Sequence, residues 1–128
     1  MKGEQFIAEV KNLAEIDNDE QARKAIGATL ETLRERLAGN EPADLAAQLP
    51  PEIAPFVEGA GGRESFSAQE FYDRVAKKEG IVGEEAIRHA RAVATVVQTA
   101  VTGGALEDVR SQLGNDYREL FGQTGASA

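Results

Sequence analysis

Apolar positions recur with helical spacing along most of the chain. Phe6, Val10 and Leu13 fall on one face of a predicted helix over about residues 5–15. A longer apolar stripe predicts an amphipathic helix over about residues 20–37. The same spacing predicts a helix from about residue 68 to Gly80, and another over about residues 84–101. The pattern therefore predicts a helical protein.

The predicted helix at residues 84–101 has the widest apolar arc, formed by alanine and valine, so we expect it to be the most buried helix and the centre of the fold. Local signals place the ends of the helices. The acidic and amide side chains at 17–19 suit an N-cap, Ser67 opens a capping box, and Gly39 suits a left-handed C-terminal position. Short helices are predicted through residues 44–49, around Ile53 and Phe56, and through 108–113 and 116–121.

The pattern of the first half returns in the second half. Phe6 aligns with Phe71 and Val10 with Val75, and one residue is lost before the later pairs. Those later pairs are Ala22 with Ala86, Ala28 with Ala92, Gly39 with Gly103, Asp44 with Asp108 and Gln48 with Gln112. We therefore predict an all-α single domain over residues 1–128, made of two pseudo-repeats of about four helices each, packed through their long helices. The expected boundaries are repeat one at 4–58, a flexible Gly-rich linker at 59–66, repeat two at 67–122 and a flexible tail at 123–128.

Composition narrows the range of functions. The chain has no cysteine, which excludes thiol catalysis, disulfides and cysteine-ligated metals. It shows no N-terminal apolar segment and no run long enough to cross a membrane, so we expect a cytoplasmic protein with no membrane partner. The net charge is −8 and no basic stripe occurs, so nucleic acid is disfavoured as a partner.

Two polar pairs recur at equivalent positions and are the candidate contact residues. Asp44 and Gln48 are four residues apart, as are Asp108 and Gln112, so each pair lies on one face of its short helix. On one reading they are symmetry-related contacts for a ligand or partner. On the other, which we favour, each Asp caps its helix while each Gln bonds backbone at a helix junction.

No constellation for catalysis is evident. His89 is the only histidine, and Glu85 lies one turn before it, so we expect a partly buried structural histidine paired to Glu85 rather than a metal site. The acidic run at 17–20 lacks the later residues of a calcium loop, and the glycines at 59–62 lack the remainder of a phosphate-binding loop. We predict no enzyme activity, no metal and no cofactor.

The order of these motifs resembles a known family. The runs DLAAQLP at 44–50, FYDRV at 71–75, GALEDVRSQL at 104–113 and YRELF at 117–121 are similar to the bacterial family catalogued as domain of unknown function 2267. One departure is Gly114, where the pattern would place a proline that matches Pro50. The resemblance implies a duplicated all-helical fold. It carries over no activity and no catalytic residue.

The sequence thus favours a non-catalytic cytoplasmic helical module that binds a protein partner or self-associates. The alternative is a protein that binds a small apolar ligand in a pocket between the two repeats, where the alanines of the predicted 84–101 helix leave room.

Overall fold

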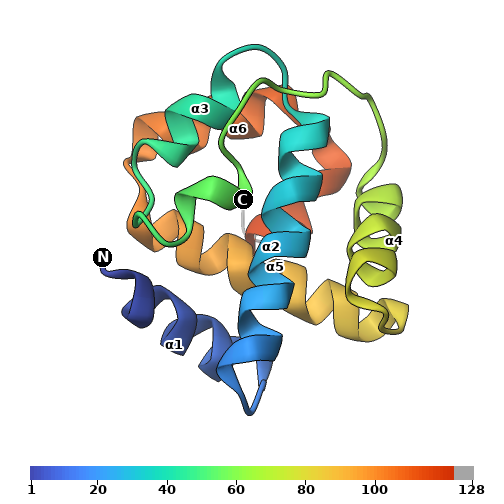
Figure 1. Cartoon of the computed structure of the whole chain (residues 1–128). Helices are drawn as coiled ribbons and strands as arrows, with labels where there is room; N and C mark the ends of the chain where they lie inside the picture. The colour runs from blue at the N-terminus through green and yellow to red at the C-terminus, as the bar shows by residue number, and fades with distance from the viewer. Residues whose placement is uncertain (123–128) are drawn as a thin grey trace.

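The described part of the chain is entirely helical. The computed structural model describes residues 1–122, and within them six α-helices and two 3₁₀-helices occur without any strand (Figure 1). In chain order they are α1 (Gly3–Ala14), α2 (Asp19–Arg36), α3 (Glu41–Ala46), η1 (Ala54–Phe56), α4 (Ala68–Glu79), α5 (Gly83–Ala100), α6 (Gly103–Gln112) and η2 (Asn115–Phe121). The predicted all-α fold is confirmed. The predicted tail, 123–128, lies outside the described residues.

Several helix ends are set by the expected local chemistry. The Asn18 side chain accepts a hydrogen bond from the Gln21 N–H at 2.7 Å and caps α2. The Ser67 hydroxyl accepts one from the Glu70 N–H at 3.1 Å and caps α4. The C-cap of that helix is Gly80, which follows its last residue. The φ of this glycine, 71°, is the left-handed conformation that glycine adopts at low cost.

The short helices differ from the prediction. The segments around Phe56 and at 115–121 are 3₁₀-helices, and α3 ends at Ala46 rather than continuing to Leu49. After α3 the Leu49 N–H bonds the Ala46 carbonyl at 3.1 Å, which is the tighter three-residue pattern. Pro50 has no N–H to donate to the Ala46 carbonyl and disfavours α-helical backbone at Leu49, so the chain cannot continue as an α-helix through this turn.

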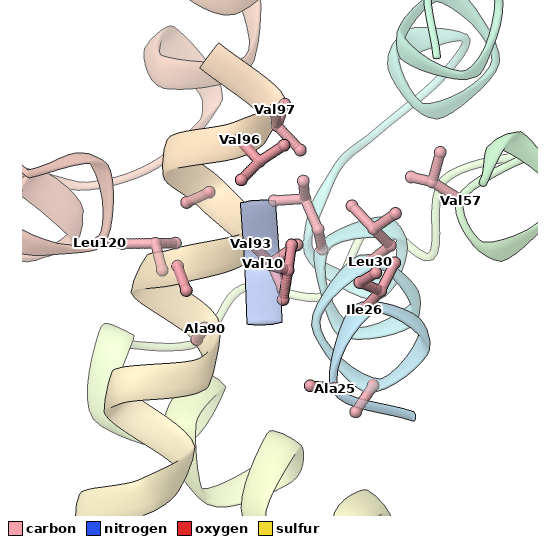
Figure 2. Close-up of a cluster of buried hydrophobic side chains, with 14 of the residues drawn as sticks. Val10, Ala25, Ile26, Leu30, Val57, Ala90, Val93, Val96, Val97 and Leu120 are labelled. Carbon is pink, nitrogen blue, oxygen red and sulfur yellow. The ribbon is translucent and has the colours of Figure 1, made fainter. Parts of the chain in front are cut away.

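The two long helices form the centre of the molecule. Helix α5 packs against α1, α2, α4 and η2, and Figure 2 shows side chains from α1, α2 and α5 gathered in one apolar cluster. Val10, Ile26 and Val93 in this cluster are completely buried. The central position expected for this helix is found. It is not the most buried helix, however, since α2 buries nine of its 18 residues and α5 buries eight.

The first helix of each half packs against the long helix of the other half as well as its own. Helix α1 contacts α5, and α4 contacts α2. Helices α1 and α4 each have 12 residues and begin 65 positions apart, at Gly3 and Ala68. Helices α2 and α5 each have 18 residues and begin 64 positions apart, at Asp19 and Gly83. These lengths agree with the interpretation as two pseudo-repeats, which stays a prediction.

The glycine-rich linker is hydrogen-bonded to the end of α2. The last carbonyls of a helix lack partners within it, and here linker N–H groups supply them. The pairs are Gly62 with Arg34 at 2.9 Å, Glu64 with Glu35 at 3.0 Å and, just beyond the helix, Arg63 with Leu37 at 3.0 Å. A Cβ atom on Gly62 would lie 2.7 Å from the Glu35 carbonyl oxygen, so this close approach requires glycine.

Candidate functional site

The two candidate glutamines meet backbone groups of the opposite half. The Gln48 side-chain oxygen accepts a hydrogen bond from the Thr102 N–H at 2.7 Å, and the Gln112 side-chain oxygen accepts one from the Ala38 N–H at 2.8 Å. Ala38 and Thr102 each lie directly after the C-cap of a long helix, α2 and α5 respectively. Helices α3 and α6 pack together at this junction (Figure 1). In the structure, therefore, these glutamines serve as hydrogen-bond acceptors for backbone N–H groups.

The two candidate aspartates do not cap their helices. Asp44 lies inside α3 and Asp108 inside α6, and both are exposed. The N-cap positions belong to Asn40 and Thr102, and the Thr102 hydroxyl accepts a hydrogen bond from the Ala105 N–H at 3.3 Å. The expected capping role of the aspartates is thus wrong, because each short helix begins earlier than the pattern suggested.

Asp44 and Asp108 influence the pKa of a neighbouring carboxyl group, that of Glu41. Burial raises the pKa of Glu41, and the negative charges of Asp108 and Asp44 raise it further. The structure therefore brings three carboxylates near one another at the α3–α6 junction. No set of metal-ligating side chains large enough to hold an ion is found there or elsewhere within residues 1–122.

The single histidine is paired with a different carboxylate from the one predicted. The His89 Nδ1 atom lies 2.9 Å from the Glu79 carboxylate, and the histidine is only 1% exposed. Glu79 is the last residue of α4, so this buried pair ties α4 to α5. The predicted partner, Glu85, is wrong because burial turns the imidazole toward α4 rather than along its own helix. Local patterns contain no signal for Glu79, since its contact with His89 is between two helices.

The surface feature that the sequence missed is a depression beside α1 and α5. It has a volume of about 350 Å³. We call it the α1–α5 groove, and its lining consists of Leu13, Glu84, Ile87, Arg88, Arg91, Ala92 and Thr95. Because α1 belongs to the first half of the chain and α5 to the second, the groove lies between the two predicted repeats.

Leu13 is the unexpected member of this groove. The sequence pattern placed it on the buried face of the first helix together with Phe6 and Val10, but it is 48% exposed while those two are fully buried. The buried face of α1 is centred on Val10 and Ala14, and Leu13 lies at its edge. An apolar side chain of this size in contact with water beside a depression is a feature that a docking surface uses.

Arg88 fixes the geometry of the groove. Its Nε–H donates a hydrogen bond to the Ala14 carbonyl at 2.9 Å, and so attaches the last turn of α1 to α5. Arg91 lies one turn farther along α5 and is exposed. Among the ion pairs within residues 1–122, none involves Arg88 or Arg91.

These features define a small all-α domain with a central pair of long helices and an open groove on its surface. None of the helices in the described part of the chain has the length and apolar character needed to span a membrane. The chain belongs to the family described as "Uncharacterized conserved protein (DUF2267)", whose match covers residues 3–120. This confirms the resemblance seen in the motifs. A search of curated proteins gives no match to the chain.

Proposed function

We propose that this protein is a non-catalytic helical module that binds a protein partner, or a second copy of itself, through the α1–α5 groove. The observation that carries the proposal is the half-exposed Leu13, which shares the groove with Ile87. Two arginines, Arg88 and Arg91, line the same groove and form no ion pair with the described residues. Exposed apolar side chains with a charged rim are typical of surfaces that bind another helix.

The lack of catalysis is supported by the use of the histidine. His89 is enclosed in the core and held by Glu79, so it has no path to a substrate in solvent. A cytoplasmic location is part of the proposal. It is compatible with the absence of cysteine, because the fold then depends on no disulfide. Nucleic acid is disfavoured as the partner because the chain carries a net charge of −8.

The second candidate function is the binding of a small apolar ligand between the two halves. It is favoured by the position and size of the groove, because about 350 Å³ is within the range of ligand sites. Against it stands the open shape of the site. Its lining includes the half-exposed Leu13 and the exposed Arg91, whereas ligand pockets usually enclose most of the ligand.

Native mass spectrometry of the chain, captured gently from its own cell extract, tests the proposal. A second polypeptide, or a multiple of the 13.7 kDa chain, is expected. Leu13→Ser should lose that mass, whereas Val82→Ser should keep it, because Val82 is 63% exposed but lies outside the groove. A bare chain that carries a small extra mass would instead support the ligand-binding function. A bare chain alone would contradict both.

A further inference from the structure

The charge of the α1–α5 groove is opposite to that of the molecule. The chain has a net charge of −8, and yet the groove contains two arginines and one glutamate. Elsewhere the cations between α2 and α4 are neutralised by neighbours. Arg74 pairs with Glu35, Glu64 and Glu70, and Lys78 pairs with Glu35. The arginines of the groove have no such pairing within residues 1–122, so their charge is available to a partner.

Within residues 1–122, both arginines of the groove have unused hydrogen-bond donors, and Arg88 is held in place on α1. Arg88 uses its Nε–H on the Ala14 carbonyl, and no described side chain or carbonyl accepts from its two terminal amino groups. Arg91 follows three residues later on the same face of α5. A carboxylate can accept two parallel hydrogen bonds from a guanidinium group, and such bonds are about twice as strong as neutral ones.

The apolar part of the groove lies beside these donors. Leu13 and Ile87 offer aliphatic surface, Ala92 in the lining is buried, and Glu84 lies one turn before Arg88. A helix with an apolar edge next to a row of carboxylates matches this arrangement. Its carboxylates would face Arg88 and Arg91, and a neutral or basic side chain would face Glu84.

We propose that the occupant of the groove is an acidic amphipathic helix of a partner protein. This inference rests on the proposed function and specifies the chemistry of the partner. A second copy packed groove to groove fits less well, because it would place Arg88 and Arg91 opposite the same two arginines of the other copy. An anionic membrane surface fits less well too, since it attracts clusters of several Lys and Arg rather than two.

A selection from a library of random displayed peptides tests the inference with the full chain as bait. The enriched peptides should carry Asp or Glu beside Leu, Ile or Phe at helical spacing. Their affinity should fall at least about tenfold for Arg91→Glu and should weaken with added salt. Arg23→Glu is the matched control. It makes the same charge change at an exposed site on α2 outside the groove, and affinity should stay within about twofold.

The outcomes separate the inference from the proposed function. Basic or uncharged peptides that bind wild type and Arg91→Glu equally, but are lost with Leu13→Ser, overturn the acidic partner and keep the groove as a binding site. Peptides whose binding neither variant disturbs, or a selection that enriches no peptide, overturn both.

Two further experiments test the other occupants. If the wild type is a dimer in sedimentation and Leu13→Ser dissociates it, the groove binds a second copy. If the wild type binds phosphatidylserine vesicles and Arg91→Glu abolishes this binding, the groove binds a membrane. Each of these two results overturns the acidic helix. Circular dichroism establishes that every variant is folded.

Discussion

Gln48 and Gln112 each accept a hydrogen bond from the backbone that follows the long helix of the opposite half. Gln48 accepts from the Thr102 N–H, and Gln112, which is 64 positions later, accepts from the Ala38 N–H, which is 64 positions before Thr102. The exchange is reciprocal, and the four positions share one offset. Both glutamines therefore bond backbone where α3 meets α6, as the favoured interpretation of the sequence expected.

Gln112→Ala should destabilise the protein by about 1 kcal/mol, because it leaves the Ala38 N–H at a partly buried site without its acceptor. Gln48→Ala should cost less, since its bond with Thr102 is exposed to water. Urea unfolding followed by circular dichroism gives both values. The matched control is Gln69→Ala, whose side chain bonds only an exposed Asp73 and should matter little. Equal effects of Gln112→Ala and Gln69→Ala would contradict the junction role.

The buried pair of His89 and Glu79 predicts a coupling that the sequence pattern does not. Removing either partner leaves the other buried without its hydrogen bond, so His89→Ala and Glu79→Ala should each cost about 1–3 kcal/mol. A double-mutant cycle between them should give a coupling energy of about 1–3 kcal/mol. The parallel cycle between His89 and Glu85 should give about 0.5 kcal/mol or less. A larger coupling to Glu85 would show that the histidine has been placed wrongly.

What the sequence predicted well follows from local physics. Amphipathic spacing located α1, α2, α4 and α5 to within about two residues. Cap chemistry at 17–19 and at Ser67 agrees with the observed N-caps, Asn18 and Ser67, and the helix predicted to end at Gly80 has this glycine as its C-cap. These signals work because the hydrogen bonds and side-chain directions involved are fixed within a few residues of chain.

What the sequence missed depends on how the helices pack. Leu13 shares the spacing of buried residues, but its exposure depends on where α5 crosses α1. Glu79 is ten residues from His89 and meets it only because α4 lies against α5. The linker looked flexible because of its glycines, yet those glycines permit the close approach to α2 that holds it in place.

A charge placed inside the central cluster should unfold the protein. Val97 on α5 is 3% exposed, and Val97→Asp would bury a carboxylate without a partner. The cost should exceed about 3 kcal/mol, out of a total stability of about 5–15 kcal/mol for a domain of this kind. Thr95→Asp is the matched control, because Thr95 is exposed on the same helix. Thermal melts that coincide for the two variants would contradict the burial of this face of α5.

The carboxylate of Glu35 should make stability depend on pH. Burial alone would raise its pKa, but hydrogen bonds from Lys78 and Arg74, with their positive charges, outweigh it and lower the pKa in the folded state. A lowered pKa gives stability that is present above the ordinary value of about 4.3 and is lost as the pH falls through the folded value. Glu35→Gln should therefore cost about 0.5–1 kcal/mol at pH 7 and progressively less in acid.

Glu41 should have the opposite effect on the pH dependence of stability from Glu35. Its pKa is raised, chiefly by burial and then by Asp108 and Asp44, so its ionised form is disfavoured in the folded protein. Glu41→Gln should raise stability slightly at pH 7, by less than about 0.5 kcal/mol, and the gain should vanish below the ordinary pKa. Urea titrations of both variants and wild type across acidic pH check the pair. Parallel pH profiles for the two variants would contradict these assignments.

The central claim is that a partner binds in the α1–α5 groove. Its most direct test is photo-crosslinking in living cells with benzoylphenylalanine at position 13, and with the same residue at position 82 as the control. Both Leu13 and Val82 are exposed, so both substitutions should be tolerated. The claim predicts that light attaches a second protein to the chain from position 13 and not from position 82. A product from position 82 alone, or none from position 13, would contradict it.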